Sequence, residues 1–72
     1  MHDRATTDQL LQSTEQNLAS LHRQLTTDEQ GQVQQIRLFM QQSRGATRDG
    51  DLVRARTLAL KAHLLSDDLL RQ

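Results

Sequence analysis

The chain has no cysteine and no proline, and it contains only one aromatic residue and three glycines. Without cysteine, neither a disulfide nor a thiolate metal site can stabilise the fold. Without proline, no position forces a helix to break in its interior. Valine and isoleucine are scarce and glutamine is abundant, and such a composition favours helix over sheet. We therefore expect an all-α protein.

The charges are balanced, with nine Lys and Arg against nine Asp and Glu. A net charge of zero supplies no overall field that would attract nucleic acid or an acidic membrane. No apolar run approaches the roughly 20 residues that span a bilayer. The first residues, MHDRATTDQ, lack the apolar core of a signal peptide, so an exported parent protein would carry its signal outside this sequence. We expect no nucleic-acid partner and no membrane-spanning segment.

Residues 1–72 are expected to form a single helical domain that is marginally stable by itself. The periodicity predicts helices over about 7–25, about 28–48 and about 51–71. Similar lengths and tight connections favour an antiparallel three-helix bundle, whose hand the sequence leaves open.

The stretch from residue 49 to residue 72 has the clearest helix start and the most apolar surface. Gly50 followed by Asp51 is typical of one helix ending and another beginning, because glycine accepts a left-handed conformation and aspartate accepts from free N–H groups. At roughly 100° per residue, one wide arc of the predicted helix is apolar and typical of a core-facing stripe. It consists of Leu52, Ala55, Leu58, Ala59, Ala62, Leu65, Leu69 and Leu70.

A second, narrower stripe on the same predicted helix consists of Val53, Leu60 and Leu64. Polar residues separate the two stripes on both sides. Two stripes indicate two partners, and the alanines of the wide stripe allow a neighbouring helix to approach closely. The narrow stripe then contacts a third helix, a second copy of the chain, or water.

The first predicted helix begins after a frayed segment, Met1 to Ala5. Thr6 with Gln9 three residues later fits a capping box. Apolar residues then recur at three- and four-residue steps in a narrow stripe that is close to a coiled-coil seam. This stripe consists of Leu10, Leu11, Thr14, Leu18, Leu21 and Leu25.

A new helix is predicted to begin where Thr26 with Glu29, or Thr27 with Gln30, fits a capping box. Its core stripe consists of Val33, Ile36, Phe39, Met40, Ser43, Ala46 and Thr47. Because no glycine or proline enforces the break, one continuous helix from about residue 7 to about residue 48 is an alternative. The first helix would then find cover only on another chain, in an intertwined dimer.

The second predicted helix carries Gly31, Leu38 and Gly45 at intervals of seven residues, all on one face. Because the two glycines have no side chain, another helix could pack closely around the leucine between them. The simpler interpretation is an exposed leucine on a solvated, glutamine-rich face.

Catalytic and metal chemistry find little support. His63 and Asp67 lie four residues apart on one helix, and His22 is predicted near Glu15, but a zinc site needs three or four converging ligands. The carboxylates that lie at predicted helix starts are explained by capping and by the helix dipole. We expect no enzymatic activity, no metal and no cofactor.

Four arginines cluster around the turn at Gly50, namely Arg44, Arg48, Arg54 and Arg56. Arginine is well suited to phosphate, which makes these residues the candidates for nucleic-acid contact. Asp49 and Asp51 interrupt the cluster and no aromatic residue is interleaved with it. A solvated end of the bundle is the favoured interpretation.

The segment GDLVRARTLALKAHLLSDDLL resembles the second helix of a tetratricopeptide-like hairpin, although the aromatic and Leu-Gly positions of that repeat are missing from the preceding helix. Together with QLLQSTEQNLASL and LTTDEQGQVQQIRLFMQQS, it is similar to the C-terminal helical region of uncharacterised bacterial envelope proteins and lipoproteins of the acidobacterial type. This resemblance covers most of the chain. It implies a helical module in the cell envelope or periplasm, and it carries over no functional residue.

The strongest positive signal is apolar surface that one copy of the chain leaves uncovered. We expect a non-enzymatic oligomerisation or scaffold module, with a homodimer as the favoured assembly. The residues expected to make intermolecular contact are Leu38, Val53, Leu60 and Leu64. The alternative is a small adaptor or regulatory protein that binds another helical protein through the same exposed stripe.

Overall fold

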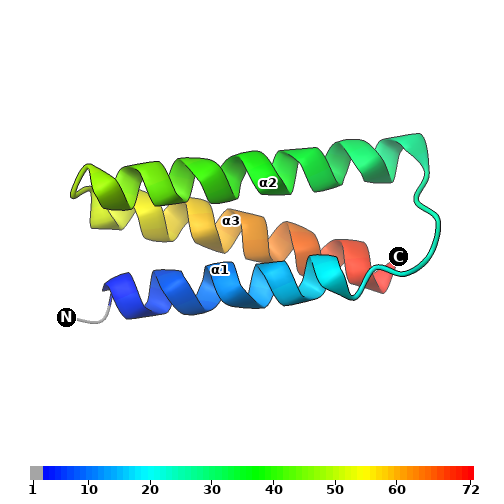
Figure 1. Ribbon diagram of the computed structural model, residues 1–72, viewed down its shortest axis with the longest axis horizontal. Helices are drawn as coiled ribbons and strands as arrows, with labels where there is room; N and C mark the ends of the chain where they lie inside the picture. The colour runs from blue at the N-terminus through cyan, green and yellow to red at the C-terminus, as the bar shows by residue number, and fades with distance from the viewer. Residues whose placement is uncertain (1–2) are drawn as a thin grey trace.

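The computed structural model describes residues 3–72 as three helices, which are α1 (Asp3–Ala19), α2 (Thr27–Arg48) and α3 (Leu52–Arg71). Figure 1 shows that α1 and α3 run in the same direction, that α2 runs in the opposite direction, and that α3 lies between the other two helices in this view. The described residues contain no strand. The prediction of an all-α three-helix bundle is confirmed.

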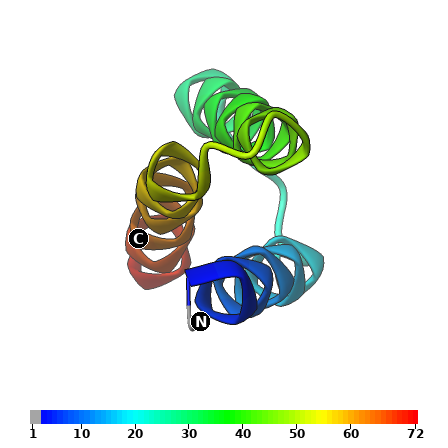
Figure 2. The ribbon, with the colours of Figure 1, turned by 90° about the vertical axis from the view of Figure 1, so that its left-hand side faces the viewer.

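The central element is α3, which packs along both α1 and α2, whereas α1 and α2 barely approach each other. Figure 2 shows this triangular arrangement end-on, with α3 at one corner. Ala55, Ala59 and Ala62 are completely buried on the inner face of α3, where their small side chains let the neighbouring helices come close. The buried apolar core consists of Leu11, Ile36, Met40, Ala46, Ala55, Leu58, Ala59, Ala62 and Leu69.

The hand of the bundle, which the sequence left open, is visible in Figure 2. Viewed from the end that carries the turn between α2 and α3, the helices follow one another anticlockwise in chain order.

A buried hydrogen bond joins α2 to α3. The Ser43 Oγ donates to the carbonyl oxygen of Ala55 over 2.7 Å.

The turn between α2 and α3 forms as the Gly-Asp pair predicts. Gly50 has a φ of 81°, in the left-handed region. The Gly50 N–H donates to the carbonyl of Thr47 and the Asp51 N–H donates to that of Ala46, the hydrogen-bond pattern of a Schellman motif. The Asp51 carboxylate then accepts from the Arg54 N–H at the start of α3. Gly45 stays inside α2.

The predicted start of the first helix was wrong. α1 begins at Asp3, so Ala5 is helical and Thr6 lies inside the helix, where it cannot cap it. Met1 and His2, which also belong to the segment predicted to be frayed, lie outside the described residues. A polar segment can be helical when the turns that follow it are anchored, and here Thr7 and Thr14 are buried on the inner face of α1.

The predicted end of the first helix, at residue 25, was also wrong, and so was the alternative of one continuous helix. α1 ends at Ala19, where the Ser20 N–H and hydroxyl both donate to the carbonyl of Gln16. Residues 20–26 form a connection that returns the chain to the start of α2. Leu21 and Leu25 therefore lie in a non-helical segment, and Leu21 still packs against the core.

The physical reason for the break is a set of polar contacts centred on Glu29. Thr26 and Glu29 form a reciprocal capping box, which requires the extended backbone that Thr26 adopts. Arg23 donates through Nη1 to Glu29 Oε1 and pairs through Nη2 with Oε2, both over 2.9 Å. Arg23 Nη2 also donates to the carbonyl of Leu69 at the end of α3, over 3.3 Å. Together these contacts tie the connection to α2 and to α3.

The predicted core stripes are largely correct on α2 and need one correction on α3. Leu65 and Leu70, placed in the wide stripe, are exposed, because they lie at its two edges and face the openings toward α2 and α1. Helical periodicity places all eight residues of the wide stripe on one face of α3. The packing of α1 and α2 buries only the middle of that face.

The two glycines at positions 31 and 50 provide a matched test of backbone conformation. A Cβ added to either residue meets no atom within 4 Å, so space does not distinguish them. Gly31→Ala should raise the free energy of unfolding by about 0.5–1 kcal/mol, because alanine is the better helix former. Gly50→Ala should lower it by about 1–2 kcal/mol, because alanine is strained at a positive φ. Urea unfolding followed by circular dichroism measures both, and changes of equal sign would contradict this account.

A second prediction concerns acid stability. The hydrogen bond from Arg23, reinforced by the Thr26 N–H, lowers the pKa of Glu29 from 4.5 to about 2. A depressed folded-state pKa means that the carboxylate stabilises the fold fully above pH 4.5, and that this contribution is lost as the pH falls toward 2. Glu29→Gln should therefore be less stable than wild type at neutral pH, with a gap in melting temperature that closes between pH 4.5 and pH 2.

The matched control is Asp28→Asn, which removes an exposed carboxylate from the same first turn of α2 and leaves the Arg23 contact intact. Suppose that Asp28→Asn lowers the melting temperature relative to wild type as much as Glu29→Gln does, with the same pH dependence. The stabilisation would then come from the helix dipole and not from the Arg23 contact.

Candidate interaction surface

The narrow stripe of α3 faces solvent along its whole length. The exposed fractions are 72% for Val53, 42% for Leu60 and 55% for Leu64. At about 100° per residue these side chains lie roughly opposite the buried alanines of the same helix. We call Val53, Leu60 and Leu64 the outer stripe of α3. It points away from α1 and α2, so no part of the bundle covers it.

Leu38, predicted as part of the same contact, is 47% exposed but lies on another face. It stands roughly 160° around α2 from the fully buried Ile36 and therefore points directly outward from α2. α2 and α3 occupy different corners of the triangle, so their outward faces diverge (Figure 2). The structure thus does not bring Leu38 together with the outer stripe. The surface at Gly31, on the same face of α2, is open, whereas the Arg48 guanidinium lies beside Gly45.

The four arginines near Gly50 are all exposed, and they do not form one patch. Arg44 turns toward α1 and pairs with Glu15 over 3.3 Å. The Arg48 guanidinium lies back along α2 beside Gly45. Arg54 and Arg56 lie on opposite flanks of α3, because two residues separate by roughly 200° around a helix.

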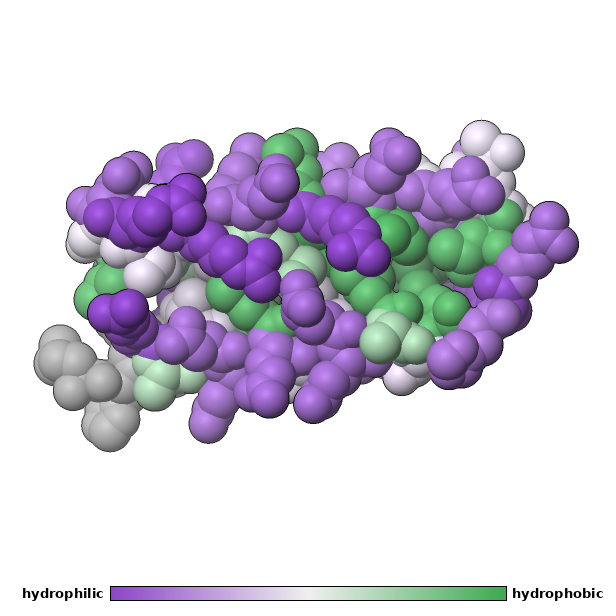
Figure 3. Space-filling model, in the orientation of Figure 1, coloured by the Kyte–Doolittle hydropathy of each residue, from purple (hydrophilic) through white to green (hydrophobic). Residues whose placement is uncertain are grey.

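A furrow between α1 and α2 is the second place where apolar surface reaches solvent. Figure 3 shows apolar side chains in this space, with hydrophilic side chains of both helices on either side. Its lining at one point consists of Glu15, Arg37, Met40, Gln41 and Arg44. The Glu15–Arg44 ion pair crosses the furrow there, and Met40 below it is already buried. The bundle therefore closes this furrow partly with its own side chains.

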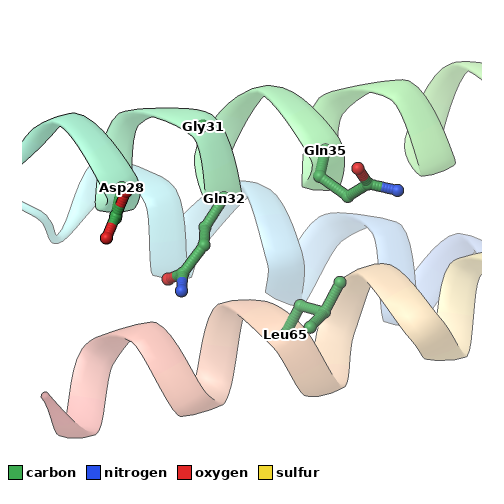
Figure 4. Close-up of a pocket in the computed structure, with 5 residues that line it drawn as sticks. All are labelled: Asp28, Gly31, Gln32, Gln35 and Leu65. Atoms are coloured by element: carbon green, nitrogen blue, oxygen red, sulfur yellow. The ribbon is translucent and has the colours of Figure 1, made fainter.

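A hollow also lies between α2 and α3, lined by Asp28, Gly31, Gln32, Gln35 and Leu65. In Figure 4 the Leu65 side chain points toward α2, Gln32 and Asp28 reach toward α3, and Gln35 turns aside. The lining contains one carboxylate and no histidine or hydroxyl nucleophile. No charged partner opposes Asp28 there, so this hollow has no recognisable catalytic set.

The predicted proximity of His63 and Asp67 is confirmed, since His63 Nδ1 lies 3.6 Å from Asp67 Oδ2. His22, by contrast, lies in the connection after α1. Among the side chains of residues 4–72, no group of three or more His, Cys, Asp or Glu is placed to hold a metal ion. None of the three helices in the described part of the chain has the length and apolarity needed to cross a bilayer.

A polar contact missed by the sequence analysis joins α1 to α3 beside this pair. Asn17 Nδ2 donates to Asp67 Oδ1 over 2.7 Å and to Ser66 Oγ over 2.9 Å. The buried Ser66 hydroxyl in turn donates to the carbonyl of His63 over 2.8 Å. Ser66 interrupts the apolar stripe of α3, and a buried hydroxyl needs a partner. That interruption was the available signal, but the partner lies almost fifty residues away in sequence.

The contacts of Asn17 hold Asp67 beside the outer stripe. Asp67 is therefore fixed on the α1 side of α3, and Asp68 is exposed on the α2 side and accepts from Gln72 over 3.4 Å. The outer stripe thus runs between charged flanks, with Arg54 and Arg56 near the start of α3 and Asp67 and Asp68 near its end, where Arg71 also lies on the outer face.

Comparison with known proteins identifies no relative: no protein-family model, no curated protein and no solved structure matches the chain.

The α1–α3 contact yields a stability prediction. Asn17→Ala removes both hydrogen bonds and should lower the free energy of unfolding by about 1–2 kcal/mol. Gln16→Ala is the control, because Gln16 is exposed and its side chain makes no hydrogen bond with the described residues. Chemical unfolding measures both variants. An Asn17→Ala effect no larger than that of Gln16→Ala would show that these hydrogen bonds do not stabilise the bundle.

Proposed function

We propose that this chain is a non-enzymatic helical oligomerisation or scaffold module that associates with a second copy of itself through the outer stripe of α3. The observation that carries the proposal is the solvent exposure of Val53, Leu60 and Leu64 on a regular helix face that the bundle does not use. Burial of these side chains in an interface makes the free energy of association more favourable, by about 25 cal/mol for each Å² of apolar surface.

The stripe is continuous along one rigid element. Leu60 and Leu64 are one turn apart and Val53 is two turns before Leu60, so the three lie on one line along the helix, with Thr57 between Val53 and Leu60. α3 is also the helix that packs on both others, so a partner bound to its outer face binds a helix that is already held in place. Leu38 on α2 belongs to a separate, second contact in this proposal.

The resemblance to envelope proteins supports placing this module at the end of a bacterial envelope protein, in the envelope or periplasm. In that setting the association of two modules would join two larger chains. The second candidate function is that of an adaptor whose outer stripe binds a different helical protein. It is favoured by the same exposed leucines and predicts a monomer in isolation.

The first test is the mass of the protein in solution, measured by light scattering over a dilution series. We expect the wild type to form a dimer that dissociates on dilution. Leu60→Glu/Leu64→Glu places two charges on the stripe and removes two apolar contacts, together about 3 kcal/mol or about 100-fold in the dissociation constant. This variant should be monomeric with its helical circular dichroism unchanged, because both leucines are exposed in the single copy.

The matched control is Leu38→Glu, the same change at an exposed leucine on another face. It should leave the α3-mediated dimer intact. A wild type that is monomeric at every concentration would refute self-association. A dimer broken equally by Leu38→Glu would show that the outer stripe is not the interface.

A further inference from the structure

We infer that two copies pair through α3 in antiparallel orientation, with a two-fold axis at the level between Leu60 and Leu64. This inference rests on the proposed function and adds to it the direction and register of the contact. It is carried by the order of charges along the two flanks of the outer stripe.

The outer face of α3 has the spacing of a coiled-coil seam. Residues on it recur at alternating steps of four and three, and every seam position falls opposite the buried core of the bundle. The seam consists of Val53, Thr57, Leu60, Leu64, Asp67 and Arg71. Leu60 and Leu64 form its apolar middle, Val53 its apolar first position, and Asp67 and Arg71 its charged end. A partner helix of the same sequence can therefore place leucines against leucines only when the two centres coincide.

Each flank of this seam begins basic and ends acidic. On the α2 side the order is Arg54, Lys61, Asp68, and Lys61 extends over the ring of Phe39 with its Nζ 5.9 Å from the ring centroid. On the α1 side Arg56 comes first and the seam residue Asp67 follows. Among the side chains of residues 4–72, Arg54 and Arg56 make no ion pair.

Only one orientation satisfies these charges. In a parallel pair, Arg54 and Arg56 would face the same two arginines of the second copy, and the aspartates would face each other, which is repulsive. In an antiparallel pair, Arg54 and Arg56 of one α3 face Asp68 and Asp67 of the other, beside Arg71 of its last turn. With Leu60 opposite Leu64 of the second copy, Val53 lies opposite Arg71 of that copy, and Arg54 comes near its Asp68.

The charges within a single α3 support the same orientation. The start of a helix carries a partial positive charge and its end a partial negative charge, so arginines near the start and aspartates near the end are unfavourable. The N-cap Asp51 is followed by no acidic residue in the first turn of α3, and Arg71 is the basic residue of its last turn. An antiparallel neighbour offsets these unfavourable interactions with the helix dipole, because it brings its aspartates to the start of α3 and its arginines to the end.

The other exposed apolar surfaces lack such an argument. The furrow between α1 and α2 is crossed by the Glu15–Arg44 ion pair, and Leu38 is surrounded by uncharged glutamines and glycines. A single pair of helix faces buries less than the roughly 800 Å² per partner of a standard interface. We therefore expect a weak dimer that forms at high protein concentration.

The absence of native cysteine allows a direct test by disulfide cross-linking. Val53→Cys and Arg71→Cys are prepared as separate proteins, mixed at a concentration where light scattering shows the dimer, and oxidised with oxidised glutathione. Mass spectrometry identifies each cross-linked species. Gln34→Cys, at an exposed position on the outer side of α2, reports cross-linking by random collision.

The antiparallel pair predicts that the mixed Val53–Arg71 disulfide exceeds the half share of cross-links that random pairing gives, and that it forms faster than the Gln34→Cys cross-link. A parallel pair would place the two positions about 27 Å apart along the axis and would cross-link Val53→Cys to itself. That result would overturn the antiparallel inference and leave the proposed dimerisation standing. A monomer in light scattering would instead refute the proposed function, and with it this inference.

Discussion

Close contact between α3 and both of its neighbours is the interaction on which the other features of this bundle depend. Ala55, Ala59 and Ala62 present almost no side chain, so α1 and α2 can each lie against the same helix. Because both pack on α3, they need little contact with each other. The same geometry turns the opposite side of α3 completely to solvent. The inner alanines and the outer leucines are thus two consequences of one helix position.

Polar contacts decide where each helix ends and how the helices align. Glu29 accepts from Thr26 and Arg23, and Arg23 also donates to the end of α3. These contacts hold the connection between α1 and α2 against both α2 and α3. Ser43 at the α2–α3 contact and Asn17 at the α1–α3 contact act in the same way. Buried polar groups must find partners, so each of these contacts penalises a shifted alignment. Leucine and alanine contacts alone would tolerate such shifts.

The outer stripe connects this architecture to the proposed function. An exposed line of Val53, Leu60 and Leu64 is costly in water unless something covers it part of the time. The arginines and aspartates beside it are unfavourable within their own helix and complementary to those of an antiparallel copy. Both features concern the same face of α3, and the proposed self-association would account for both. Asn17 contributes by holding Asp67 on that face.

Local patterns in the sequence determined the helical class, the Gly50 turn, the Thr26 capping box and the two faces of α3, because each depends on residues within a few positions of one another. The exposure of Leu38, Val53, Leu60 and Leu64 also followed from helical periodicity. Contacts between distant residues decided the rest. Arg23 and Glu29 ended α1 early, Asn17 found Ser66 across the bundle, and the triangular packing exposed Leu65 and Leu70 and separated Leu38 from the outer stripe. Periodicity describes a single helix, whereas these outcomes depend on where a second and third helix lie.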